Sequence, residues 1–530
     1  MSLTPSRRLL MHWSRFGWLA ALCLVTPTLA QPSLSSIGSA ASYLPDGLPG
    51  SGIARGSFFY LIGTGLGPGT PVSAAVYPLD VTLGGTQVSV TVGGTTVVAF
   101  PFYASAQQVN AVLPSNTPIG AGTAQVSYAG HSAAIAIQVV DAAFGILTLN
   151  SAGTGPAVVT HANYSPVTLA SSLHPGEPAI MWGTGLGAVP FPDNQPATAG
   201  DIGSGVEIFV GGKLANAQYY GRAPGYSGLD QINFVVPAGL DGCAVSLAVR
   251  VSNRLSNFTS IAVAPDGQDV CNSGDWVSSA LAFTAPSGKV IAGLISLATS
   301  SAFVSFYQYD YQSLIRSAQV TQTHIAAGDC WMQFYGPNGQ PPADPFSPAF
   351  VYPWQWLYVK RPDGTTVEGL AGLPNYADVG FLVAGTYQVS PGPPALGTIA
   401  TFGPFLATLV VPSSFNNYLK WSSGGVGAVI PRNQDLTVTW TASDTTANVF
   451  VSGNTTRSLH NTAQFICRAP AGATSLTVPS YVLGALPQTT SGGGFFYVSL
   501  NLPGPPFTAP QLYAGQTSLG IQFNTELDYQ

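Results

Sequence analysis

Hydrophobic and polar residues alternate along much of this chain, in short stretches. Val88–Val92 has the sequence Val-Ser-Val-Thr-Val, and Leu436–Trp440 has the sequence Leu-Thr-Val-Thr-Trp. A period of two places alternate side chains on opposite faces of a half-buried β-strand. No window combines a long helical apolar period with helix caps. The pattern therefore predicts an all-β protein built from short strands.

Three sequence landmarks occur twice, in the same order. They are a Gly-Thr-Gly-Leu-Gly segment, a Val-Gly-Gly turn and a Gln-Val/Ile-Asn strand that runs on to a proline. They lie at 63–67, 92–94 and 108–114 in the first copy and at 183–187, 210–212 and 231–237 in the second. Ordered recurrence of this kind predicts a duplicated domain.

Gly (61) and Pro (43) are frequent and suit short strands joined by turns. We therefore predict tandem immunoglobulin-like β-sandwiches followed by two further β-sandwich-like domains. The predicted boundaries are a signal peptide at 1–30, a linker at 31–50, Ig-like domain 1 at 51–140, a connector at 141–172, Ig-like domain 2 at 173–268, domain 3 at 273–412 and domain 4 at 413–530.

The first 30 residues have the features of a secretory signal. Arg7, Arg8 and Arg15 form a positive region, residues 16–25 are apolar, and Thr28-Leu29-Ala30 offers small residues for cleavage. No later apolar run is long enough to span a bilayer. We expect an exported protein that is secreted or held at the cell surface, with no membrane span after signal removal.

Charged residues make up only 7% of the chain, and the net charge is -6 with 16 Lys plus Arg. Such a surface cannot bind a polyanion through positive charge, which argues against a nucleic-acid partner. The partners expected instead are extracellular polysaccharides or surface proteins.

Four cysteines remain after signal removal, and an even number in an exported chain favours disulfides. Three pairings are possible. We favour Cys243 with Cys271, which flank a hairpin-like stretch, and a bond there would contribute about 3 kcal/mol. Cys330 and Cys467 then form the second pair. Four buried free thiols are the alternative.

The paired motifs are similar to the uncharacterised Solibacter-type C-terminal domain of secreted acidobacterial proteins. That domain in turn looks like tandem IPT/TIG-type immunoglobulin-like modules. The resemblance covers residues 51–264, and the second half more loosely resembles β-rich tails that accompany this domain. It implies an exported bacterial protein with Ig-like folds, and it implies no activity and no binding residues.

The glycine-rich segment Gly183–Ala188 imitates the G-x-G-x-x-A fingerprint of dinucleotide-binding proteins. That chemistry needs a helix directly after the glycines, and the proline-containing Val189–Asp193 follows instead. We therefore predict a glycine-shaped turn and no cofactor. The histidines after the signal lack metal-binding spacing, so no metal site is expected. They are His131, His161, His174, His324 and His460.

Aromatic residues provide the best indication of binding. Tyr352, Trp354, Trp356 and Tyr358 occur at every second position, and Tyr307, Tyr309 and Tyr311 form a second row. In a strand such a row lines one face, opposite a core face of Val351, Leu357 and Val359. The row either binds a ligand by stacking or fills the sandwich or a domain interface.

These patterns favour a non-enzymatic cell-surface or extracellular adhesion or structural protein. The alternative is a carbohydrate-binding protein that uses the Trp/Tyr strand faces. A third possibility is an extracellular hydrolase whose site has no local motif. There is no G-x-S-x-G elbow in the sequence, but distant carboxylates can still meet in space.

Overall fold

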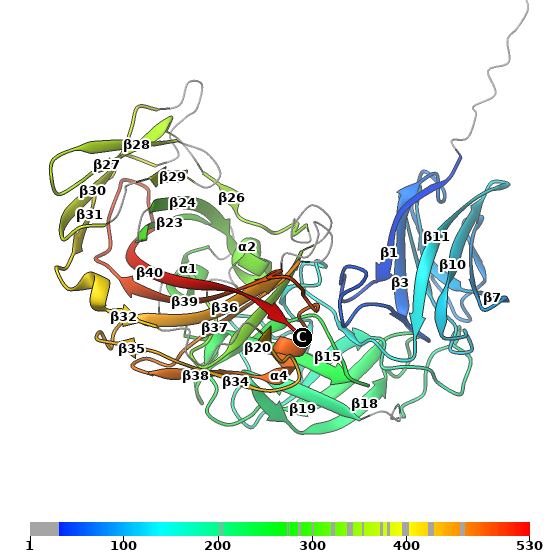
Figure 1. Cartoon of the computed structure of the whole chain (residues 1–530). Helices are drawn as coiled ribbons and strands as arrows, with labels where there is room; N and C mark the ends of the chain where they lie inside the picture. The colour runs from blue at the N-terminus through cyan, green and yellow to red at the C-terminus, as the bar shows by residue number, and fades with distance from the viewer. Residues whose placement is uncertain are drawn as a thin grey trace, which may run out of the picture.

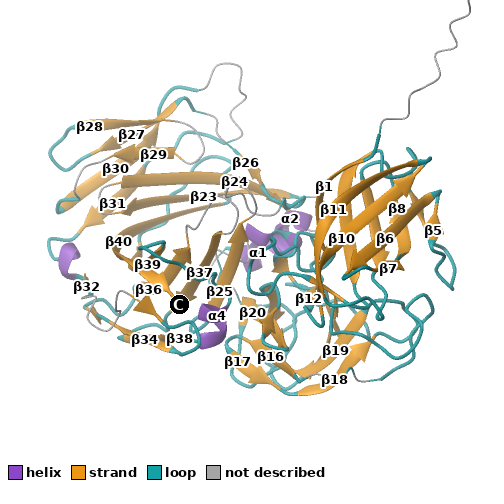
Figure 2. Ribbon diagram, turned by 45° about the vertical axis from the view of Figure 1, so that its right-hand side comes forward, coloured by secondary structure: helices purple, strands orange, loops and turns teal. Residues whose placement is uncertain are grey.

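Strands are the dominant regular structure of the residues that the structure describes, which confirms the predicted all-β fold class (Figures 1 and 2). The computed structural model describes residues 31–530, apart from positions 201, 203–204, 273, 275, 285–287, 299–300, 320–323, 336–342, 352–353, 371–374, 379–381, 395–401, 422–428 and 456–461. The predicted signal peptide at 1–30 lies outside the described residues, as do Tyr352 and His460.

The first repeat is a sandwich of a five-stranded and a six-stranded sheet. Val88, Val90 and Val92 point into its core, as their alternation predicts, and meet Phe59 and Val109 of the facing sheet. In spatial order the sheets are β1 (Ser33–Ser39), β3 (Phe58–Thr64), β9 (Gln108–Val112), β8 (Phe100–Ala104), β4 (Val72–Ser73), and β2 (Ile53–Ala54), β11 (His131–Val140), β10 (Gly120–Tyr128), β6 (Thr86–Val92), β5 (Thr82–Leu83), with β7 (Thr95–Val98) on β6.

The main strands of the second repeat have the same order as those of the first, so the sequence duplication is also a duplication of strand order. In both copies a short strand joins one sheet edge in parallel, β2 on β11 and β13 on β22. The sheets are β12 (Gly145–Ile146), β15 (Pro178–Thr184), β19 (Asp230–Val235), β18 (Ala217–Arg222), with β14 (Val159–His161) on β15; and β13 (Gly155–Pro156), β22 (Thr259–Val263), β20 (Gly242–Val251), β16 (Val206–Val210), β17 (Lys213–Ala215), with β21 (Arg254–Leu255) on β20.

Two segments predicted to connect domains contain strands of those domains. β1 lies within the expected linker at 31–50, and β12, β13 and β14 lie within the expected connector at 141–172. These strands are short or rich in serine and glycine, so they lack the alternation that signals a strand.

The glycines of the repeated Val-Gly-Gly motif form hairpin turns. Gly93 and Gly94 have φ of +56° and +82° in the β6–β7 hairpin, and Gly211 and Gly212 have +55° and +73° in the β16–β17 hairpin. Positive φ at both central residues is the requirement of a type I′ hairpin turn. No helix follows the second Gly-Thr-Gly-Leu-Gly segment, as the prolines predict.

The second half is organised around a ten-stranded sheet that takes strands from both sides of residue 412. β23 pairs in parallel with β40, so the expected boundary between domains 3 and 4 does not separate two sheets. The sheet comprises β25 (Cys330–Tyr335), β37 (Thr462–Arg468), β36 (Asn448–Thr455), β39 (Gly494–Pro503), β40 (Ala514–Tyr529), β23 (Lys289–Ala298), β24 (Ser301–Asp310) and β26 (Ala349–Phe350), with β29 (Asn375–Asp378) on β24 and β33 (Val429–Ile430) on β40.

A four-stranded sheet lies beside this large sheet, at the upper left of Figure 1. Its strands in spatial order are β28 (Thr366–Leu370), β27 (Trp356–Lys360), β30 (Gly385–Pro391) and β31 (Ala407–Val411). The remaining elements are the pairs β32 (Leu419–Lys420) with β35 (Thr441–Ala442) and β34 (Leu436–Thr439) with β38 (Ser475–Val478), the helices α1 (Val277–Thr284), α2 (Tyr311–Arg316) and α4 (Ser480–Gly484), and the 3-10 helix η2 (Phe415–Asn417).

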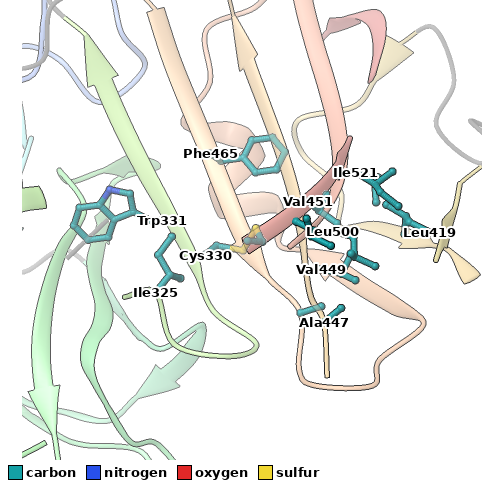
Figure 3. Packing of buried hydrophobic residues seen from close by; sticks show 14 of the residues in the cluster. Ile325, Cys330, Trp331, Leu419, Ala447, Val449, Val451, Phe465, Leu500 and Ile521 are labelled. Carbon is teal, nitrogen blue, oxygen red and sulfur yellow. A yellow bond between two sulfur atoms is a disulfide. The ribbon is translucent and has the colours of Figure 1, made fainter. Parts of the chain in front are cut away.

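Both predicted disulfides are present. Cys243 is bonded to Cys271, and Cys330 of β25 is bonded to Cys467 of β37. The second bond lies in the main core of the second half, where Trp331, Val451 and Phe465 belong to the same buried cluster (Figure 3).

Buried polar contacts join neighbouring parts of the fold. Asp193 of the second repeat accepts from both the N–H (2.6 Å) and Oγ (2.7 Å) of Ser115 in the first repeat. Arg222 pairs with Asp230 within the second repeat and donates to the carbonyl of Gly56 in the first repeat at 2.7 Å. These side chains are almost fully buried, so the two sandwiches share a polar interior at their junction.

Candidate functional site

The predicted aromatic row divides into a buried part and a half-buried part. Trp354 is only 4% exposed, and its ring centroid lies 4.6 Å from that of Phe402 and 5.9 Å from that of Phe306. The prediction that Trp354 faces a ligand is therefore wrong. β27 begins at Trp356, whereas Trp354 forms a separate bridge to Pro394, so the alternation of one strand does not extend to it.

Trp356 and Tyr358 lie on the face of β27 that points away from the core. Leu357 and Val359, between and after them, are buried, as predicted for the opposite face. The indole N–H of Trp356 donates to the hydroxyl of Tyr358 at 2.8 Å, which fixes the two rings relative to each other.

The Trp356 ring also packs against the backbone of Gly392. A Cβ atom at Gly392 would come within 2.6 Å of Trp356 Cδ1, so only glycine leaves room for this ring. Gly392 also donates its N–H to the Trp356 carbonyl at 2.8 Å. The position of the indole is thus set by packing and by a backbone hydrogen bond.

Polar side chains surround the aromatic pair on the same face. Register places Tyr358 between Glu368 of β28 and Ser390 of β30, and Lys360 opposite Gln388. The edge strand β31 adds Thr408 and Val410, of which Val410 is 58% exposed. We call this set the outer sheet face: Trp356, Tyr358, Lys360, Glu368, Gln388, Ser390, Thr408 and Val410.

The other face of the same sheet belongs to the core. Tyr387, Val389 and Leu409 are buried there, alternating with Gln388, Ser390 and Thr408. The four strands therefore have one packed face and one face directed to solvent, as is usual for an antiparallel sheet. The outer sheet face has the chemistry for stacking on the flat face of a ligand and for hydrogen bonding around it.

The second tyrosine row does not form a comparable surface. Tyr309 is 6% exposed and packs on Trp276 with ring centroids 5.2 Å apart, while Tyr311 begins α2. Tyr307 and Tyr311 are both half-buried, and Tyr307, on β24, contacts Phe350. β24 ends at Asp310, which is the N-cap of α2, so Tyr311 does not share a strand face with Tyr307 and Tyr309. The tyrosines of this row therefore contribute to packing.

Sequence reasoning missed the polar residues of the outer sheet face. Gln388 and Ser390 alternate with buried residues in Gly385–Pro391, which indicates a strand but not its neighbours. Glu368 joins them only through the pairing of β28 with β27. Strand order across a sheet is a tertiary property that a single sequence does not reveal.

No protein-family model and no curated protein matches this chain. Among solved structures it is similar to the extracellular region of plexin A4, with 14% identity over 47% of this chain and 20% of that chain, and a TM-score of 0.17. It is also similar to the I9-I11 tandem from titin, with 7% identity over 68% of this chain and 94% of that chain, and a TM-score of 0.14.

A further similar structure is SGBP-B from a complex xyloglucan utilization locus in Bacteroides uniformis. It has 10% identity, 94% coverage of this chain and 98% of that chain, and a TM-score of 0.15. The chain spans 20% and 31% of the length of the two plexin A4 chains that it matches.

Two classes of feature are missing from the residues that the structure describes. They contain no group of three or more His, Cys, Asp or Glu side chains that could hold a metal ion. No helix among them has both the length and the apolar character needed to cross a membrane.

Proposed function

We propose that this chain is an exported protein of the cell surface or extracellular space, whose principal role is adhesion or structural support rather than catalysis. Two disulfides support this compartment, because such bonds persist in oxidising surroundings outside the cytosol. The scaffold suits the role: the tandem sandwiches meet through buried polar contacts such as Ser115–Asp193, which hold neighbouring modules in fixed positions.

We further propose that the protein attaches to neutral polysaccharide through the outer sheet face. The observation that carries this proposal is the fixed pair of half-buried rings, Trp356 and Tyr358, on a sheet whose other face is core. Residues two apart in a strand are separated by about 6.6 Å. An aromatic platform of this width can contact successive rings of a sugar chain by stacking.

The polar surroundings favour an uncharged ligand. Lys360 and Glu368 supply one charge of each sign, while Gln388, Ser390 and Thr408 supply neutral hydrogen-bonding groups. An amide and hydroxyls can exchange hydrogen bonds with sugar hydroxyls without the desolvation cost of burying an unpaired charge.

The test uses residues 31–530 on a glycan array and in sedimentation with insoluble polysaccharides. We expect binding by the wild-type chain and at least about tenfold weaker binding by the W356A/Y358A double variant, which corresponds to about 1.4 kcal/mol. Tyr226→Ala is the matched control, because Tyr226 is 55% exposed and lies in the second repeat. Equal binding by both variants would reject this face, and no binding to any glycan would reject the ligand class.

A further inference from the structure

A chain of hydrogen bonds runs through the connector that precedes β15. Ser171 Oγ lies 3.2 Å from His161 Nε2, and His161 Nδ1 lies 2.6 Å from Glu177 Oε1. His161 ends β14, Ser171 ends a tight turn closed by backbone hydrogen bonds to Thr168, and Glu177 directly precedes β15. Three chain positions are thus brought into contact by the sandwich.

The hydrogen-bonded series of hydroxyl, imidazole and carboxylate is the arrangement that activates the serine of a catalytic triad. Both distances fall within the hydrogen-bonding range expected between a nucleophile, its base and the group that orients the base. The short contact to Glu177 favours a proton on His161 Nδ1, since a carboxylate can only accept. Nε2 is then unprotonated and can take the proton of Ser171.

Glu177 is itself held in place by His174. The carboxylate oxygen Oε2 accepts from the His174 backbone N–H at 2.9 Å and lies 3.2 Å from His174 Nδ1. The other ring nitrogen of His174 lies 3.1 Å from the carbonyl of Gln268. Burial opposes the charged form, but the hydrogen bonds from His161 and His174 outweigh it and lower the pKa of the Glu177 carboxyl.

The cluster is partly exposed to solvent. The side chains of His161 and Glu177 are 15% and 23% exposed, and Ser171 is half-buried. The carbonyl of Ser171 lies 3.3 Å from His161 Nε2, so it can accept from that nitrogen once the ring is protonated. The site can therefore hold the proton that a reacting serine gives up.

We propose that Ser171 is a nucleophile, activated by His161 and oriented through Glu177, that attacks small acyl esters such as O-acetyl groups. Ser171 Oγ would form a bond to the carbonyl carbon while its proton passes to His161 Nε2. The ester C–O bond would then break, and the leaving alcohol would take that proton. Water would hydrolyse the acyl-serine and release the acid. This chemistry goes beyond the binding role and is independent of the outer sheet face.

The surroundings of Ser171 predict slow turnover. The backbone N–H groups of Ser171 and Ser172 already donate to the carbonyls of Thr168 and Asp269. They are therefore not available to an oxyanion, and the loss of one such donor costs about 100- to 1,000-fold in rate. Covalent labelling is for that reason a better first measurement than turnover.

The deciding experiment treats residues 31–530 with a biotinylated fluorophosphonate and locates the adduct by peptide mass spectrometry. We expect the adduct on Ser171, no adduct in Ser171→Ala, and about 100-fold slower labelling in Glu177→Gln, which keeps the shape of the side chain but removes its charge. Ser165→Ala is the control, since Ser165 Oγ donates to Asn163 on the same connector and its loss should leave labelling unchanged.

Thermal unfolding of each variant separates a chemical role from a structural one. A labelling rate that falls while the melting temperature stays constant supports the proposal. An unlabelled wild-type chain, or an adduct on another residue, would overturn it even if the Ser171 variant failed to fold. The W356A/Y358A variant should label normally, so failure here leaves the polysaccharide proposal unaffected.

Discussion

Asp329 accepts two hydrogen bonds from Ser246 across the junction between the second repeat and the second half. Its two carboxylate oxygens accept from the N–H of Ser246 at 2.7 Å and from its Oγ at 2.6 Å. The pairing repeats the contact of Asp193 with Ser115 at the preceding junction. Each junction thus uses a carboxylate from one module and a serine from its neighbour.

The stability of the protein should depend on pH through Asp329. Full burial raises the pKa of this carboxyl to about 6, although the hydrogen bonds from Ser246 and Cys330 oppose the shift. The folded value exceeds the unfolded one, so the contribution to stability is complete below about pH 4 and is lost as pH rises through 6. Two pKa units correspond to about 3 kcal/mol.

Melting curves of the wild-type chain and Asp329→Asn from pH 4 to 8 measure this effect. The amide does not titrate, so the wild-type chain should gain stability relative to the variant as pH falls from 7 to 4. Other groups titrate equally in both proteins and cancel in the difference. A difference that is flat across this range would contradict the expectation.

Trp354→Ala should destabilise the fold, whereas Trp356→Ala should not. Removal of the buried indole of Trp354 leaves a cavity among Phe306, Phe402 and Phe405, and such substitutions cost about 3–5 kcal/mol. Trp356 is only partly covered, so its loss should cost about 1 kcal/mol or less. Urea unfolding of the two variants gives both values, and similar costs would mean that Trp354 is not a core residue.

Asp230→Asn should be among the most destabilising polar substitutions. Asp230 and Arg222 are both buried, and the substitution removes the carboxylate that is in direct contact with the guanidinium, at a cost of about 3–5 kcal/mol. Glu207→Gln, the same chemical change in the exposed pair with Arg250, should cost less than about 1 kcal/mol. Chemical denaturation compares the two, and equal effects would refute the distinction.

The two disulfides should differ in their contributions. The chain separation is 28 residues for Cys243–Cys271 and 137 for Cys330–Cys467. Chain entropy alone predicts about 3.6 kcal/mol for the shorter loop and about 5 kcal/mol for the longer one. Unfolding of the two double-alanine variants tests this order; a larger loss for the shorter loop would show that loop entropy does not dominate.

Prediction from the sequence succeeded where a local pattern carries the structure. The inward valines of β6, the glycine hairpins and the tandem sandwiches all follow from alternation and repetition. Both disulfides followed from the cysteine count and one hairpin-like stretch. In each instance the physical constraint acts within a short segment or recurs in the second copy.

Prediction failed where the structure depends on distant pairing. Trp354 continues the every-second-residue spacing of Trp356 but lies outside its strand. The alternating pattern therefore predicted the wrong face for the Trp354 side chain. The outer sheet face needs strand order, which brings Glu368 beside Tyr358. Ser171, His161 and Glu177 have no motif spacing, because a turn and a sheet, rather than a helix, bring them together.

The parallel pairing of β23 with β40 has a consequence for how the chain matures. Ala292–Ala298 can find their partners, Ala514–Gly520, only after more than 200 further residues have been synthesised. The two repeats contain all their own sheet partners and can fold as soon as they emerge. The ten-stranded sheet must wait for β40, so deletion of this strand should disrupt that sheet while leaving the repeats intact.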